Sequence, residues 1–217
     1  QGAIGWIMVA SGLQPGMIAV APVKLTLHLV FASLFLMSLA AMATAMTPPR
    51  ATERPASPGL RAGAWIVGCL ILFQIALGGL VAGSRAGMTY NTWPLMDGQF
   101  VLPFSTLFAT TPWIENFVDN IPLVQFNHRI GAYIVLIVAA WHAIAASRAQ
   151  RGSSFSKRAH AIAGLALTQG LLGIATLLLA VPLWAGLAHQ ALAMVVLAMA
   201  TIHVTRASGA RVESRRA

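Results

Sequence analysis

Residues 63–83 read GAWIVGCLILFQIALGGLVAG, and this stretch decides the fold class. It runs for 21 residues without an Asp, Glu, Lys or Arg. A helix that crosses a bilayer needs about 20 predominantly apolar residues. In hydrocarbon, a single segment satisfies its backbone donors and acceptors only by forming a helix. The stretch therefore predicts a transmembrane helix.

The rest of the chain repeats this pattern. Charged residues make up 9% of the 217 residues, whereas a soluble domain carries roughly 25%. Mean hydropathy is +0.75. Further apolar segments cover about 1–12, 24–46, 122–146, 159–181 and 186–206, the first being only part of a span. The predicted fold is all-α, a polytopic transmembrane helix bundle.

The basic residues predict an orientation for these helices. Eleven of the fourteen Lys and Arg residues lie in the 47–62 loop, the 147–158 loop and the 206–217 tail. The positive-inside rule makes these segments cytoplasmic and the 84–121 loop periplasmic. Because the net charge of +9 is distributed between apolar runs, it indicates membrane topology and argues against binding of nucleic acid.

A short repeat suggests that the bundle has two halves. Gln1-Gly-Ala-Ile-Gly5 resembles Gln169-Gly-Leu-Leu-Gly173, and each stretch leads through a Pro-containing turn into a helix with a histidine near its start. We predict two pseudo-symmetric four-helix halves. Residues 63–217 are a complete carboxy-terminal half, and residues 1–62 are the third and fourth helices of an amino-terminal half. The chain is therefore expected to be a fragment that lacks the first two helices.

Three histidines, His28, His128 and His189, are predicted near the periplasmic ends of their helices. An ionisable side chain inside a membrane is costly and marks a functional site by default. Two neutral imidazoles from facing helices can bind one haem iron from both sides. We predict that His128 and His189 are the axial ligands of a haem. The alternative for each is a hydrogen-bonded packing residue.

The neighbours of His128 fit such a site. Arg129 could pair with a haem propionate through a charge-assisted hydrogen bond. Gln125 and Asn127 could orient the imidazole. Cys69 is the sole cysteine, which excludes an intrachain disulfide and a CxxC metal site.

Two further histidines leave an alternative open. His142 follows His128 by fourteen residues, as His203 follows His189. Fourteen residues are nearly four helical turns, or about 21 Å. The pairs could therefore hold two haems stacked across the membrane, as in a dihaem b-type electron-transfer cytochrome. The simpler interpretation places His142 and His203 at the cytoplasmic interface, and His160 in solvent at that edge.

Several motifs of the sequence together resemble those of a known family. The stretch Gly78-Gly-Leu-Val-Ala-Gly83 continues to Thr89-Tyr-Asn-Thr-Trp-Pro-Leu-Met-Asp-Gly98, followed by Gln125-Phe-Asn-His-Arg129 and His189-Gln190. These motifs closely resemble the cysteine-poor subtype of the haem A synthase family of proteobacteria and mitochondria. The resemblance covers essentially the whole chain. A transporter or assembly scaffold that uses histidines only for packing is the alternative from another class.

The resemblance implies an activity and a location. The family has eight transmembrane helices in the bacterial inner membrane, and it oxidises a methyl group of haem O to the formyl group of haem A for cytochrome oxidase assembly. His128 and His189 would bind haem b, and His28 would bind the substrate haem. The other amino-terminal histidine of the family has no counterpart, so this chain alone is expected to be inactive. Haem O synthase, an electron donor and a second copy of the chain are the partners that the resemblance suggests.

Overall fold

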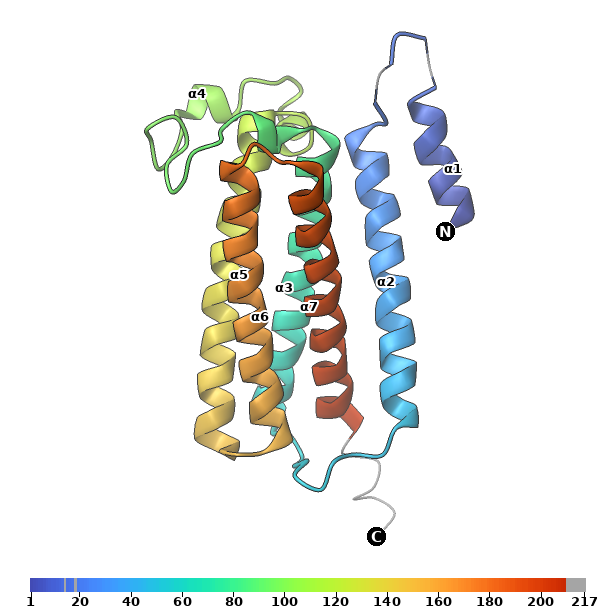
Figure 1. Ribbon diagram of the computed structural model, residues 1–217, viewed down its shortest axis with the longest axis vertical. Helices are drawn as coiled ribbons and strands as arrows, with labels where there is room; N and C mark the ends of the chain where they lie inside the picture. Colours follow the sequence, from blue (N-terminus) through green and yellow to red (C-terminus); the bar gives the residue numbers. More distant parts are fainter. Residues whose placement is uncertain (14, 18, 210–217) are drawn as a thin grey trace. The chain divides into compact units, whose positions relative to one another are not determined.

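The computed structural model describes residues 1–13, 15–17 and 19–209, and in this part of the chain helices dominate (Figure 1). An extended loop separates α3 from α5, and shorter segments join the other long helices. The helices are α1 (Gly2–Ser11), α2 (Pro22–Met46), α3 (Pro58–Gly83), α5 (Ile121–Gln150), α6 (Ser154–Leu178) and α7 (Leu183–Gly209). The loop contains η1 (Ala86–Met88), α4 (Phe104–Leu107) and η2 (Trp113–Phe117).

The six apolar segments of the sequence are all helices. Among the described residues, five helices are long and apolar enough to cross a membrane, and α1 is a shorter apolar helix. The all-α, polytopic prediction is confirmed. Helices α2 and α3 begin earlier than predicted, at Pro22 and Pro58, because proline suits the first helical position, where the backbone N–H has no partner within the helix. Of the predicted cytoplasmic tail, residues 210–217 lie outside the described part.

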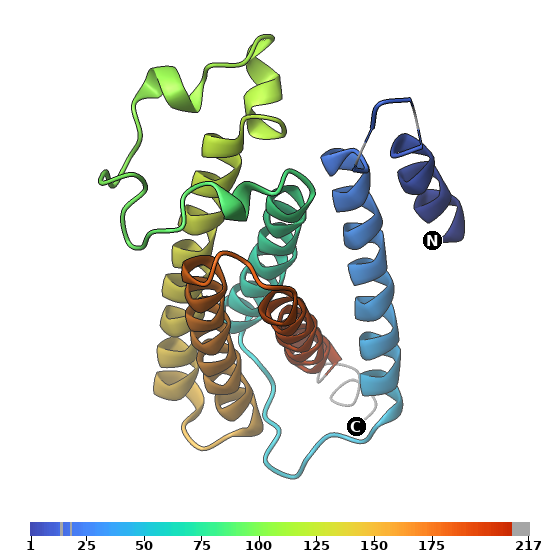
Figure 2. The ribbon, with the colours of Figure 1, turned by 45° about the horizontal axis from the view of Figure 1, so that its top comes forward.

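The chain divides into two compact units, and each long helix from α2 to α7 contributes residues to both. The first unit comprises Gln1–Ala32, Phe73–Ala132 and Leu171–Gln190. In it, α1 lies beside α2 (Figure 2). Helix α3 approaches α2 closely, since a Cβ atom added at Gly83 would lie 2.7 Å from Cα of Pro22. Small residues at such contacts let helices in membranes pack closely.

The long loop of the first unit has a hydrophobic core of its own. Met96, Leu102 and Leu107 are buried together with Leu123 of α5. Met96 and Gln99 exchange two backbone hydrogen bonds across Asp97-Gly98, whose φ angles are +50° and +76°. Asp-Gly is favoured in tight turns that require positive φ at both central positions. The loop is therefore a folded structure that packs on the start of α5.

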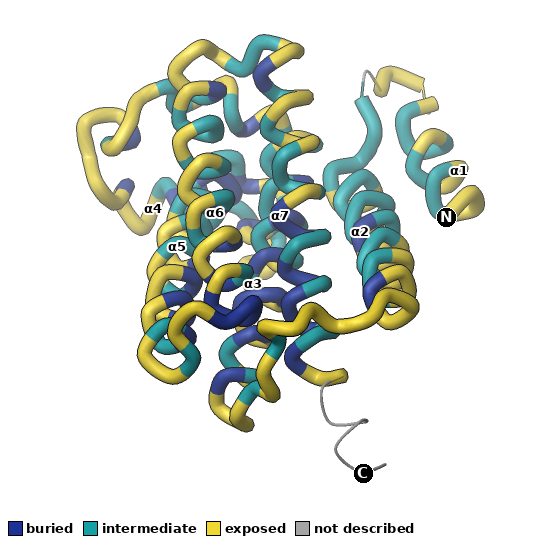
Figure 3. Tube along the Cα trace, turned by 60° about the horizontal axis from the view of Figure 1, so that its bottom comes forward, coloured by how far each residue is buried: buried dark blue, intermediate teal, exposed yellow. Residues whose placement is uncertain are grey.

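The second unit comprises Ser33–Leu72, Tyr133–Gly170 and Ala191–Ala217. Its core is built largely from alanines around Phe155, which is fully buried, while exposed residues recur along α2 and α5 (Figure 3). Glu53 of the α2–α3 connection accepts two hydrogen bonds from Arg158 of α6, at 2.6 and 2.7 Å. This bidentate ion pair attaches the connection to the amino-terminal part of α6.

Candidate functional site

The imidazole of His128, on α5, is held by two residues of α3. Gln74 Nε2 lies 3.0 Å from Nδ1 of the ring and donates to the carbonyl oxygen of the same histidine at 2.8 Å. One turn later, Gly78 faces the ring, and a Cβ atom added there would lie 3.2 Å from Cε1. The glycine thus admits the ring between the two helices, and the glutamine fixes its rotation.

His189, near the start of α7, meets the neighbouring helix α6 in the same way. A Cβ atom added at Gly173 would lie 2.8 Å from Cε1 of the ring, closer than real side chains permit. Two imidazoles of the first unit, on α5 and α7, thus each pack against a glycine of the preceding long helix.

His28 occupies a third site of this type, between α2 and α1. A Cβ atom added at Gly5 would lie 3.0 Å from Cε1 of the ring. Gln1 Nε2 lies 3.1 Å from Nδ1 and donates to the carbonyl oxygen of His28 at 3.1 Å. The short repeat seen in the sequence thus corresponds to a repeated contact between a histidine and the helix before it.

Arg129 binds the long loop. Its Nη2 donates to the carbonyl oxygen of Tyr90 at 2.8 Å and to Oε1 of Gln125 at 3.1 Å, and its Nη1 donates to the carbonyl oxygen of Leu95 at 3.3 Å. Gln125 is buried and donates to the carbonyl oxygen of Ala86. Gln125 therefore connects α5 to the loop, and the orienting role that the sequence suggested for it is filled by Gln74.

The second unit contains a different histidine pair. His142 and His203 are 4% and 0% exposed, and their Nε2 atoms are 2.9 Å apart. A metal–imidazole bond is about 2 Å long, so two rings on one iron need about 4 Å between their nitrogens, with the porphyrin plane between them. The hydrogen bond leaves no such space. Both rings are buried against Phe155, whereas His160 is exposed.

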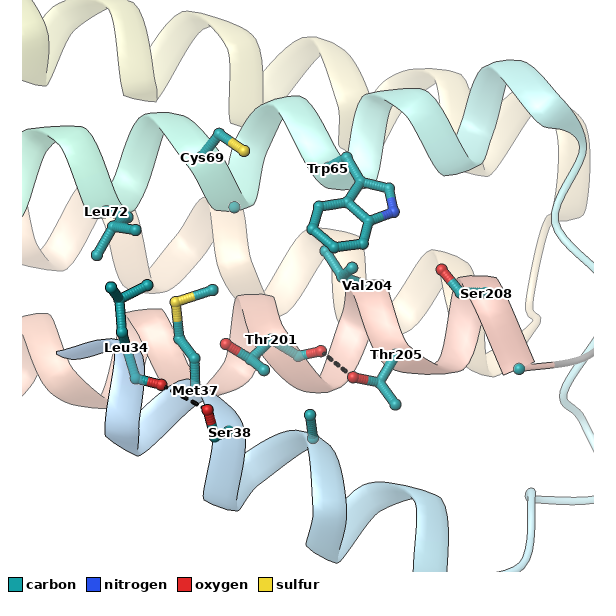
Figure 4. Close-up of a pocket in the computed structure, with 13 residues that line it drawn as sticks. Leu34, Met37, Ser38, Trp65, Cys69, Leu72, Thr201, Val204, Thr205 and Ser208 are labelled. Atoms are coloured by element: carbon teal, nitrogen blue, oxygen red, sulfur yellow. Dashed lines mark hydrogen bonds between the residues drawn. The ribbon is translucent and has the colours of Figure 1, made fainter. Parts of the chain in front are cut away.

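An apolar cavity of about 590 Å³ also lies in the second unit, between α2, α3 and α7 (Figure 4). The hydroxyl groups of Ser38, Thr201 and Thr205 on its wall each donate to a backbone carbonyl of their own helix. The wall therefore presents mainly apolar surface, and it contains none of the histidines.

The sequence reasoning missed Gln74 and the glycine that follows it. Gln74-Ile-Ala-Leu-Gly78 is a third copy of the spacing seen in 1–5 and 169–173. It escaped notice because its second position is Ile instead of Gly. The structure shows that the essential spacing is Gln-x-x-x-Gly, one helical turn, followed by a histidine on the next long helix. A search for that looser pattern would have found all three copies.

Comparison with known proteins identifies the family. Residues 1–201 match the sequence profile of the cytochrome oxidase assembly protein family, COX15-CtaA. The chain belongs to this family. It is 61% identical over 203 residues to a protein named heme A synthase from Methylobacterium sp. (strain 4-46), covering 94% of this chain and 56% of that protein.

Other members of the COX15-CtaA family carry the same name. Identity is 60% over 211 residues with heme A synthase from Methylobacterium nodulans, covering 97% of this chain and 58% of the relative. It is 46% over 212 residues with the protein from Beijerinckia indica, covering 97% and 59%. The chain thus spans somewhat more than half the length of these relatives. No solved structure matches it.

Proposed function

We propose that this chain is the larger part of a haem A synthase, with a haem b held between His128 and His189. One observation carries the proposal. The imidazoles of His128 on α5 and His189 on α7 belong to the same compact unit, and each ring is admitted by a glycine of the preceding long helix. The donor set, two neutral imidazoles from facing helices, suits a low-spin haem iron.

The substrate side of the proposal rests on His28. Its ring is held by Gln1 and faces Gly5, as the ring of His128 is held by Gln74 and faces Gly78. This equivalence supports His28 as a ligand of the substrate, haem O, whose methyl group the enzyme would oxidise to the formyl group of haem A. The relatives with about 60% sequence identity to this chain are named heme A synthases, which supports the same assignment.

The protein's own residues would position the reactants and exclude water. The bound haem b would supply electron transfer, since side chains alone cannot carry a multi-electron oxidation. Arg129 lies beside His128 and binds the long loop through the carbonyls of Tyr90 and Leu95. It is suited to hold the loop near the haem and to pair with a propionate. The loop, with its own hydrophobic core, would cover this end of the site.

The location follows from the helices and charges. Five helices suited to membrane crossing are present among the described residues, and we assign them to a bacterial inner membrane. The 47–62 and 147–158 loops and the 206–217 tail face the cytoplasm, and the 84–121 loop faces the periplasm. Residues 1–62 would belong to the substrate-haem half and 63–217 to the haem b half. Haem O synthase, an electron donor and a second copy are the proposed partners.

The test is the optical spectrum of the chain purified from haem-replete membranes. The proposal predicts a low-spin bis-imidazole b-type spectrum that disappears in His128→Ala and in His189→Ala. His160→Ala is the matched control, because His160 is exposed and its partners among the described residues are Ser147 and Ser156. It should retain the full spectrum.

Each outcome decides between the candidate functions. If either variant retains the spectrum, the histidine replaced in that variant is not a haem ligand. Two haems per chain, one lost in His142→Leu, would favour the dihaem cytochrome. A chain that purifies without haem under these conditions would favour the transporter or scaffold. Conversion of haem O to haem A by the full-length protein, abolished by His28→Ala, would establish the substrate side.

A further inference from the structure

Gln74 contacts both the ring and the backbone of His128. Its Nε2 carries two hydrogens, one directed at Nδ1 of His128 and one at the carbonyl oxygen of the same histidine. A contact with the ring alone would not restrain the backbone of α5 against movement relative to α3. Holding both atoms fixes the ring rotation and the position of the backbone together, which is the property that a metal ligand needs.

The amino-terminal copy reproduces this two-point contact. Gln1 Nε2 is 3.1 Å from both Nδ1 and the carbonyl oxygen of His28. In addition, Cε1 is the ring atom nearest to a Cβ added at Gly5, at Gly78 and at Gly173 alike. The three rings therefore present the same edge to the preceding helix. We call this arrangement the Gln-Gly-His motif: a glutamine, a glycine four residues later, and the histidine that faces them.

The ring of His142 shows what the motif adds. It too faces a glycine, Gly63, but the nearest ring atom to an added Cβ is Nδ1, at 2.5 Å. The position four residues before Gly63 is occupied by Gly59, so the preceding helix offers no amide there. This ring bonds His203 through Nε2. A glycine contact alone thus accompanies a structural histidine, and the glutamine marks the other three.

The chemistry of the amide gives Gln74 a specific role. A neutral imidazole that binds iron through Nε2 carries its hydrogen on Nδ1 and needs an acceptor there. Gln74 Oε1 is buried and has no hydrogen-bond partner among the described residues. Rotation of the amide would bring this oxygen to Nδ1 in exchange for the hydrogen bond that Nε2 donates to the carbonyl oxygen of His128. Gly131 of α5 borders Oε1, and a Cβ at that position would collide with it. A neutral amide also costs less to bury in a membrane than a carboxylate.

We infer that Gln74 is a positioning residue for the haem ligand His128 and that its amide oxygen accepts the Nδ1–H when Nε2 binds iron. Residues 1–28 contain a second Gln-Gly-His motif, and residues 169–189 repeat its spacing and its contact between glycine and histidine. The inference rests on the proposed haem b site. It goes beyond that site because it assigns a residue outside the ligand set and predicts its influence on the iron.

The test compares Gln74→Leu and Gln74→Glu in the haem-loaded full-length protein by redox titration and by electron paramagnetic resonance. Loss of an outer hydrogen bond to a metal ligand typically weakens binding by about 10–100-fold, so Gln74→Leu should retain haem less well by a similar factor. Its midpoint potential should rise, because the ring becomes a poorer donor. In Gln74→Glu, a stronger acceptor should shift the potential the other way. A tenfold change in the one-electron equilibrium corresponds to about 59 mV.

Two further variants keep the test decisive. Gly131→Ala pushes the Gln74 amide away and should reproduce the Leu phenotype even if Gln74→Leu folds poorly. Gln150→Leu is the matched control, because Gln150 also donates to a backbone carbonyl, that of Pro55, but is not bonded to a histidine. It should leave the potential unchanged. If the wild type binds haem through His128 and His189 while all Gln74 variants keep its potential and haem retention, the inference fails alone. If the wild type binds no haem, the proposed function fails first.

Discussion

The two units of the molecule use buried histidines in opposite ways. In the first unit, His28 and His128 are each held at Nδ1 by a glutamine, and with His189 they share the same contact with a glycine. In the second unit, His142 and His203 bond each other through Nε2. The second arrangement uses Nε2 for a bond between the two rings, whereas Gln74 contacts the ring of His128 at Nδ1. The partner of each ring, more than its burial, distinguishes a proposed ligand from a packing residue.

The largest effect is expected when a side chain fills the space that a glycine leaves for one of the rings. In Gly173→Val, the new side chain would occupy the space of the His189 ring, because even a Cβ would lie 2.8 Å from Cε1. We expect complete loss of the b-type spectrum. Gly164→Val on the same helix is the control, since a Cβ there meets nothing within 4 Å. A normal spectrum in Gly173→Val would mean that His189 does not need this position.

A smaller effect, on stability and not on haem binding, is expected from changes to the histidine pair of the second unit. His203→Leu leaves Nε2 of His142 buried without a partner, which costs about 1–3 kcal/mol. The double variant His142→Leu/His203→Leu removes both polar groups and should recover much of this loss. Thermal unfolding in detergent measures the effect. The b-type spectrum should be unchanged throughout, and loss of haem from the single variant would show that this pair is more than a structural contact.

The most local of the three effects is expected in the long loop. Arg129→Gln removes the hydrogen bonds to the carbonyls of Tyr90 and Leu95. A hydrogen bond to a charged group contributes about 1.5–3 kcal/mol, and 1.4 kcal/mol corresponds to a factor of ten. Amide hydrogen exchange between residues 90 and 95 should therefore accelerate at least tenfold. Arg85→Gln, at an exposed arginine of the same loop, should leave exchange there unchanged, and equal acceleration in both variants would refute a specific role for Arg129.

Much of the fold could be predicted because the length of each apolar segment can be measured directly in the sequence. The segment 63–83 and its counterparts became helices with ends shifted by a few residues, as the hydrocarbon requirement for internal hydrogen bonding dictates. The division into two halves, at residue 62, stays a prediction. The loop between α3 and α5 was predicted only as turn-rich, since its core depends on contacts between Met96 and Leu123, which are distant in sequence.

The sequence by itself determined that this chain crosses a membrane repeatedly and which histidines lie at helix ends, because hydropathy and residue spacing are read along one chain. Only the tertiary structure decided which atom of each ring is engaged. Gln74 precedes His128 by 54 positions, and His142 precedes His203 by 61, so neither pairing has a local signal. Which ring nitrogen is engaged depends on the side chain that the neighbouring helix places against the ring, and that follows from helix packing.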